Sequence, residues 1–166
     1  MLTLDSARSF FKYSDWANGF ILRAAGTLAD DQLDRPFAMG RGSLRMELLH
    51  VWAGEHVWLQ RWQGRAETPW PNEEEHVAIS GITERLATAW RERDAFLATL
   101  ADRDLARVIT YRDSKGSLFS ATLADMMTQM IVHSTHHRAQ IVNMLRNVGV
   151  TPAPDLDYMY WVRKPV

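Results

Sequence analysis

The chain has 166 residues, about the size of one domain, and 46% of them are hydrophobic, so we expect residues 1–166 to form a single domain with a sizeable core. Its 19 Lys and Arg residues balance 20 Asp and Glu residues, and no apolar run reaches the length of a membrane span, which excludes nucleic-acid and membrane partners. The absence of cysteine excludes disulfides, thiolate metal ligands and a cysteine nucleophile together.

Four segments have the apolar periodicity and the end signals of helices. We expect these helices over residues 6–28, 43–63, 82–101 and 122–148. Ser43 is the predicted N-cap of the second helix, because its hydroxyl can accept a hydrogen bond from the first turn. Thr122 and Asp125 form a capping pair at the start of the fourth helix, and Gly149 ends it.

A small β-hairpin is expected between the third and fourth helices. Apolar, β-branched and aromatic residues alternate over 107–112 and 117–119, around a turn at 113–116 that contains a glycine. The acidic stretch at 72–75, before the third helix, is interpreted as solvated surface and not as a site. The predicted fold class is therefore all-α, a four-helix bundle with one hairpin.

Three of the six histidines fall close together in the fourth predicted helix. At 100° per residue, His137 lies in the middle of that helix's apolar stripe, His133 lies beside it, and His136 falls on the flank. The stripe consists of Leu123, Met126, Met130, Ile141, Met144 and Val148. His133 and His137 are one turn apart, with Cβ atoms about 6 Å from each other, so both rings can reach one metal ion.

The second predicted helix supplies a further inward histidine. Its polar strip contains Arg45, His56, Gln60 and Gln63. His50 lies about 120° from that strip and points inward, whereas His56 points outward. Gly54, one turn from His50, leaves room for a ligand pocket.

Two interpretations of the inward histidines remain open at this point. Each of His50, His133 and His137 could be a core residue that is hydrogen-bonded to a neighbour. The sequence shows no obvious acidic partners for them, however, and an unsatisfied buried polar group costs about 1–3 kcal/mol. One shared cation would satisfy all three, which favours a metal site. His56, His76 and His136 are interpreted as surface residues.

Five motifs in order resemble the DinB/YfiT-like family of metalloenzymes over nearly the whole chain. They are Tyr-Ser-Asp-Trp-Ala-Asn at 13–18, Gly-Ser-Leu at 42–44 with Leu-Leu-His at 48–50, Tyr-Arg at 111–112 with Gly116, the signature His133-x-x-x-His137-Arg138-Ala139-Gln140-Ile141, and Pro-Asp-Leu at 154–156 with Tyr158. Ala139 stands where family members often carry glycine, and both residues are small.

The resemblance implies a four-helix bundle, usually a homodimer, that holds a divalent metal ion with His50, His133 and His137. Relatives include transferases and isomerases that use low-molecular-weight thiols such as bacillithiol, mycothiol or glutathione. We therefore expect a metal-dependent enzyme that activates such a thiol for transfer to a small electrophile. A chain without cysteine would need an external thiol for this chemistry.

Two alternatives are a metal-dependent hydrolase that activates water and a non-catalytic metal- or ligand-binding stress protein. Imidazole ligands suit zinc, nickel, copper or iron equally. No general base is assigned, because Glu47, Glu55 and Arg138 point away from the ligand face. Tyr13, Asn18, Asp155 and Tyr158 would approach the pocket only if the first helix and the tail fold over it. The N-terminus lacks a signal pattern, so we expect a cytoplasmic protein with a small-molecule substrate.

Overall fold

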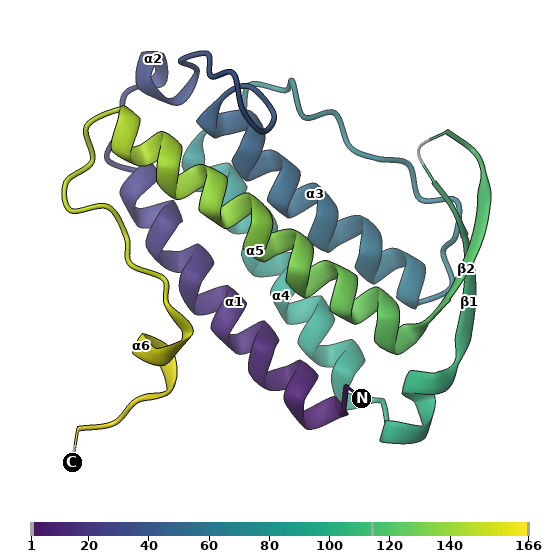
Figure 1. The fold of residues 1–166 in the computed structure, drawn as a ribbon. Helices are drawn as coiled ribbons and strands as arrows, with labels where there is room; N and C mark the ends of the chain where they lie inside the picture. Colours follow the sequence, from purple (N-terminus) through teal and green to yellow (C-terminus); the bar gives the residue numbers. More distant parts are fainter. Residues whose placement is uncertain (1, 114, 166) are drawn as a thin grey trace.

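The computed structural model describes residues 2–113 and 115–165, and four long helices dominate it (Figure 1). These are α1 (Leu4–Ala25), α3 (Leu44–Trp62), α4 (Ile79–Ala98) and α5 (Leu123–Asn147). The all-α fold class is confirmed, with each helix end within a few residues of its predicted position. Three short helices were not expected: α2 (Asp30–Leu33), the 3₁₀ helix η1 (Asp102–Ala106) and α6 (Tyr158–Val162). Among the described residues, no helix combines the length and hydropathy needed to cross a membrane.

The helix ends are fixed by the side chains that the sequence indicates. Ser43 accepts a hydrogen bond from the backbone N–H of Met46 at the start of α3. Thr122 accepts one from the backbone N–H of Asp125 at the start of α5. Both predicted N-caps are therefore confirmed, and they set where the histidine-bearing helices begin.

The predicted hairpin is present between α4 and α5. Its strands β1 (Val108–Arg112) and β2 (Leu118–Thr122) pair antiparallel, with Thr110 opposite Ser120. The second strand extends further than expected and runs directly into α5, because Thr122 ends the strand and also caps the helix. Ser114, in the predicted turn, lies outside the described residues.

The direction of the helices explains why one long connection crosses the bundle. α1 and α5 run one way, whereas α3 and α4 run the other way (Figure 1). α5 packs on α1 and α3, and α4 packs on the same two helices. Because α3 and α4 follow each other in sequence and are parallel, residues 63–78 must return along the length of the bundle. Figure 1 shows this segment running beside α3, so it passes the middle of that helix.

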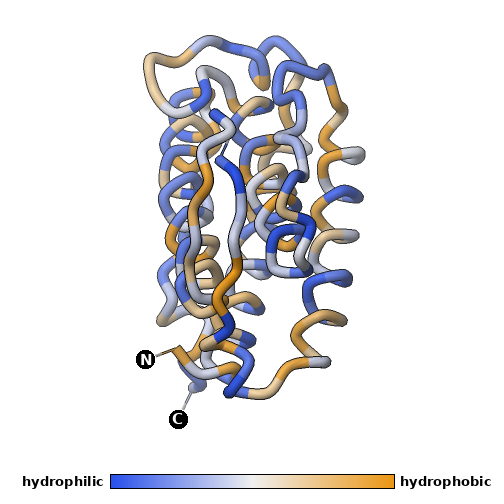
Figure 2. The backbone as a smooth tube through the Cα atoms, turned by 90° about the vertical axis from the view of Figure 1, so that its right-hand side faces the viewer, coloured by the Kyte–Doolittle hydropathy of each residue, from blue (hydrophilic) through white to orange (hydrophobic). Residues whose placement is uncertain are grey.

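A polar layer separates two apolar clusters in the core. One cluster joins the end of α1 to the start of α3, with Ile21 and Leu48 as examples. The other joins the start of α1 to the end of α3, with Phe11 and Trp62 as examples. Figure 2 shows hydrophilic and hydrophobic residues alternating along the helices. The polar residues between the clusters include His50, Glu55, Arg93, His133 and Arg138.

Candidate metal centre

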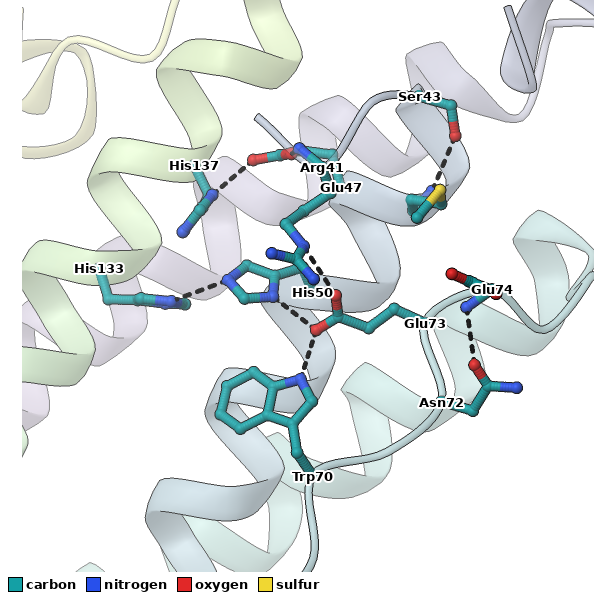
Figure 3. Close-up of polar contacts among 11 residues, drawn as sticks. Arg41, Ser43, Glu47, His50, Trp70, Asn72, Glu73, Glu74, His133 and His137 are labelled. Atoms are coloured by element: carbon teal, nitrogen blue, oxygen red, sulfur yellow. Dashed lines mark hydrogen bonds and ion pairs between the residues drawn. The ribbon is translucent and has the colours of Figure 1, made fainter. Parts of the chain in front are cut away.

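The three histidines selected from the sequence converge between α3 and α5 (Figure 3). His50, His133 and His137 each offer one ligand nitrogen, and these nitrogens lie within 4.8 Å of one another. The Nε2 atoms of His50 and His133 are 3.2 Å apart. Only 13% of the His50 side chain and 12% of the His137 side chain are exposed, so the group is largely shielded from water.

A carboxylate behind the ring fixes the protonation of His137. Glu47 Oε1 lies 2.5 Å from His137 Nδ1, and Glu47 is fully buried. A carboxylate can only accept there, so Nδ1 carries the proton and the Nε2 lone pair is free. The prediction that Glu47 points away from the histidines was wrong, because its side chain reaches across to α5 and contacts the Nδ1 side of the His137 ring.

A second carboxylate fixes the protonation of His50 in the same way. Glu73 Oε1 lies 2.5 Å from His50 Nδ1, and the same oxygen accepts from the indole N–H of Trp70. Hydrogen bonds from His50 and Trp70 lower the pKa of Glu73 against the opposing effect of its burial. Both histidines therefore direct Nε2 lone pairs toward the centre of the group.

The prediction that residues 72–75 form solvated surface was wrong for one residue. Asn72, Glu74 and Glu75 are exposed, whereas Glu73 is 6% exposed. The residue lies on the connection between α3 and α4, where no helical periodicity distinguishes an inward from an outward side chain. The expectation that the histidines lack acidic partners was also wrong. A histidine that faces a glutamate brought in from another segment leaves no local signal in the sequence.

His133 is held as a neutral ring. Its burial, followed by the proximity of His137 and His50, lowers the pKa of His133 to about 3. Metal ions bind neutral imidazole, so this environment favours coordination. A Cβ atom added at Gly54 would lie 2.8 Å from His133 Cε1. Gly54 thus makes room for the His133 ring.

The donor set fits a divalent transition ion. Two nitrogens bound tetrahedrally to one ion at about 2.1 Å lie about 3.4 Å apart, close to the observed separation of His50 and His133. A direct bond between those two rings would satisfy one lone pair and leave that of His137 facing the same centre. The pattern of histidine ligand, Nδ1 proton and outer carboxylate is typical of metal sites in proteins.

The other histidines are not part of this group, although the ring centroid of His136 lies 5.0 Å from that of His137. His76 and His136 are exposed, as predicted. His56 is only half-buried and stacks on Trp52, with the ring centroids 5.7 Å apart. It therefore presents part of its ring to solvent, as expected of the outward face of α3.

The polar strip on α3 is less exposed than expected, because α2 covers part of it. Arg45 is 2% exposed and forms ion pairs with Asp30 and Asp34, and Gln60 is 8% exposed. Asp30, Asp34 and His76 also lie close enough to share an ion. Both carboxylates are already paired with the Arg45 guanidinium, and this group carries no assignment.

The first helix and the tail do not fold over the histidines. Tyr13 donates a hydrogen bond to the carbonyl of Leu156 at 2.6 Å, and Asn18 donates to Glu55 at 3.1 Å. Tyr158 packs against Tyr13, and α6 lies beside α1 (Figure 1). The suggestion that these groups approach the pocket was wrong.

Other residues near the ligands in sequence lie as the helical angles indicate. Arg138 donates to Ser14 at 2.6 Å, on the α1 side of α5. Glu55 accepts a hydrogen bond from Asn18, which also lies on α1. Asp155 lines a cavity between α5 and the tail together with Tyr13 and Arg138.

Comparisons with known proteins agree with this architecture. The chain is 21% identical over 155 residues to protein DinB of Bacillus subtilis, covering 90% of each chain. A DinB-like crystal structure from Bacillus cereus superposes with a TM-score of 0.74 at 19% identity, covering 92% of this chain and 97% of that one. YfiT from Bacillus subtilis, described as a probable metal-dependent hydrolase with an unusual four-helix bundle topology, gives a TM-score of 0.70 at 19% identity, covering 91% of this chain and 92% of that one.

The match to a family model is more extensive than any single motif. The model of the DinB family matches residues 1–163, a range that takes in every helix from α1 to α6. That range includes the three histidines and both carboxylates that face them. The chain therefore belongs to the DinB family.

Proposed function

We propose that the protein is a metal-dependent hydrolase in which His50, His133 and His137 hold a divalent transition metal ion. The observation that carries this proposal is the convergence of three ring nitrogens, two of them turned inward by carboxylates at Nδ1. Three neutral ligands would leave coordination positions open on an ion held by the histidines, and such an ion would lower the pKa of a water molecule bound to it. The description of YfiT supports this reaction class.

The carboxylates orient the ligands and are not free bases. Glu47 Oε2 accepts from the backbone N–H of Arg41 at 2.6 Å, and Glu73 Oε2 accepts from the Arg41 side chain at 2.8 Å. Each of the other two oxygens faces a histidine. Their negative charges, partly offset by the Arg41 guanidinium, lower the cost of burying a dipositive ion. The ligand set does not select among zinc, nickel, copper and iron.

Thiol transfer is the second candidate, and the position of Arg41 favours it. This side chain is 48% exposed and donates to Glu73, the carboxylate that also faces His50 (Figure 3). A basic group there could hold the carboxylate of a low-molecular-weight thiol while the thiol occupies the open position. The family resemblance supports the same reaction, and the chain has no cysteine of its own.

A paired activity screen tests both candidates. Metal-loaded protein is assayed with amide and ester substrates without thiol, and with small electrophiles plus bacillithiol, mycothiol or glutathione. We expect turnover in the absence of thiol. A chelator or the His137→Ala substitution should abolish this turnover, and the His136→Ala variant should retain it. Turnover that requires a thiol would favour thiol transfer over hydrolysis as the function. Tight metal binding without any turnover would favour the non-catalytic stress protein.

We further propose that residues 1–166 act as one domain on a small-molecule substrate and form a homodimer, as the family resemblance implies. Helices α4 and α5 each pack on both α1 and α3, so the four helices form one bundle, which supports a single domain. Sedimentation equilibrium gives the oligomeric state, and a monomer at micromolar concentration would contradict the dimer.

A further inference from the structure

One residue is hydrogen-bonded to both of the carboxylates that face the Nδ1 atoms of the candidate metal ligands. Arg41 lies in the turn that precedes α3. Its backbone N–H donates to Glu47 Oε2 at 2.6 Å, and its side-chain Nε donates to Glu73 Oε2 at 2.8 Å (Figure 3). The other oxygen of Glu47 faces His137, and the other oxygen of Glu73 faces His50.

We propose that Arg41 is a positioning residue, which orients Glu47 and Glu73 and, through them, His137 and His50. This inference rests on the proposed metal site. Outer hydrogen-bond partners fix the ring orientation of metal ligands, so a residue that holds two of them affects two ligands at once. In this role Arg41 acts on the ligands through the carboxylates and not through contact with the metal.

The turn around Arg41 is shaped to approach the Glu47 carboxylate. Gly40 and Gly42 have φ angles of 53° and 94°, in the left-handed region that favours glycine. A Cβ atom at Gly40 would collide with the carboxylate of Glu47, whereas one at Gly42 would meet no described atom within 4 Å. The turn therefore brings its backbone N–H against Glu47, and only Gly40 is needed for that close approach.

The side-chain contact matters most for Glu73. Glu47 is held by a helix, but Glu73 lies on the connection between α3 and α4, so its position depends on its hydrogen bonds. Its Oε1 is shared by His50 and Trp70, and its Oε2 receives the charged donor of Arg41. A buried carboxylate that loses a charged partner shifts or reorients to recover one. We expect such a shift to displace the ring of His50.

Zinc affinity of the metal-free full-length chain tests the proposal independently of turnover. We expect Arg41→Ala to weaken Zn²⁺ binding about 10–100-fold and to shift the visible bands of the Co²⁺ form. Arg41→Lys should recover most of the affinity, because it restores a cation beside Glu73. Arg8→Ala removes an ion-paired, 38% exposed arginine from α1 and should match the wild type. An Arg41→Ala variant with wild-type affinity and an unchanged Co²⁺ spectrum would overturn the proposal.

A double variant shows whether Arg41 acts through Glu73. If it does, Arg41→Ala should reduce Zn²⁺ affinity almost no further in a Glu73→Gln background. An equal loss in both backgrounds would mean that Arg41 acts separately, as an anion-binding residue would, and would overturn the positioning role. Wild-type protein that binds Zn²⁺ tightly without turnover refutes the hydrolase proposal alone. Wild-type protein that binds no divalent ion refutes both.

The glycine pair tests the backbone contact with Glu47. Gly40→Ala and Gly42→Ala both place alanine at a positive φ, with the greater backbone strain at Gly42, but only Gly40→Ala places a methyl group against the carboxylate. We expect Gly40→Ala to weaken Zn²⁺ binding at least tenfold more than Gly42→Ala does. Equal effects would show that strain alone is responsible, and would overturn this part of the proposal. Circular dichroism of each variant confirms that the helices are retained.

Discussion

Two buried polar clusters lie at the middle of the bundle, on different sides of α3 and α5, and they differ in how their charges are balanced. The histidine cluster contains His50, His133, His137, Glu47 and Glu73. The ionic cluster contains Asp15, Asn18, Glu55, Arg93 and Arg138. Neighbouring residues on one helix belong to different clusters, as His137 and Arg138 do.

The ionic cluster contains its own cations and anions. Arg93 is 1% exposed and donates to both oxygens of Asp15, at 2.9 and 2.6 Å. Its guanidinium also lies 3.7 Å from Glu55, which accepts from Asn18. These contacts join α1, α3 and α4 through opposite charges within the cluster, so the cluster serves to hold helices together.

In the histidine cluster, only ring nitrogens that point away from the centre have carboxylate partners. Its carboxylates face Nδ1 of His50 and His137, so the Nε2 lone pairs of these two rings face the centre. A hydrogen bond from His133 to His50 satisfies one of these lone pairs and leaves that of His137 facing the centre, which therefore accepts a cation or a further donor. The comparison shows that burial of polar groups alone does not mark a binding site. What marks it is a set of acceptors that share one empty direction.

The largest expected effect is in the ionic cluster, and it concerns stability alone. Arg93→Ala should lower the free energy of unfolding by about 3–5 kcal/mol, because it leaves buried carboxylates without their cation. Zn²⁺ affinity should stay within about twofold of wild type. Urea unfolding and zinc titration measure the two quantities, with the exposed Arg91→Ala on the same helix as control. A large loss of zinc affinity in Arg93→Ala would show that the clusters are coupled.

The next effect belongs to the histidine cluster and concerns the metal. His137→Ala should abolish the stabilisation by zinc, which at 100 times the dissociation constant is about 2.7 kcal/mol for the wild type. Elemental analysis and melting curves with and without zinc measure it. The exposed neighbour His136→Ala should behave as wild type. Unchanged metal content and melting temperature in His137→Ala would refute the ligand assignment.

The sequence predicted the residues of the histidine cluster that obey helical periodicity. His133 and His137 are four residues apart on one apolar stripe, and His50 lies on the inward face of α3. Periodicity depends only on local geometry, so it was sufficient for the helices, their caps and these three rings. It also separated His136 from the inward pair.

The partners of those rings could not be predicted in the same way. Glu73 reaches His50 only because α3 and α4 run parallel, which forces residues 63–78 back along the bundle. Arg45 is buried by α2, a helix too short for periodicity to reveal. Both cases depend on topology, and topology does not appear in the spacing of residues within one segment.

A smaller effect tests the space around His133. Gly54→Ala should weaken Zn²⁺ binding by on the order of tenfold, because the new methyl group would displace the His133 ring. The free energy of unfolding of the metal-free protein should change by less than about 1 kcal/mol, since alanine favours a helix more than glycine does. Gly19→Ala, in α1, has an ordinary contact at 3.4 Å and should leave zinc affinity unchanged. Equal zinc affinities in the two variants would contradict the role of Gly54.

The smallest effect in the wild type is its pH dependence, because the two clusters oppose each other. Burial raises the pKa of Glu55 from 4.5 to about 7, so the folded state binds more protons and Glu55 makes stability fall as pH rises through that range. His133 has a pKa lowered from 6.5 to about 3, so the unfolded state binds more protons there and stability rises with pH. Between pH 4.5 and 6.5 the two slopes act in opposite directions.

Single variants should separate these slopes in metal-free protein. Relative to wild type, the free energy of unfolding of Glu55→Gln should increase with pH, by up to about 1.4 kcal/mol per unit, and that of His133→Asn should decrease. Differences from wild type cancel the titration of all shared groups. Urea unfolding at half-unit steps with a chelator present measures both. If the free energies of unfolding of both variants, relative to wild type, changed in the same direction with pH, the two clusters would not have opposite pH dependence. Their separate roles would then lose this support.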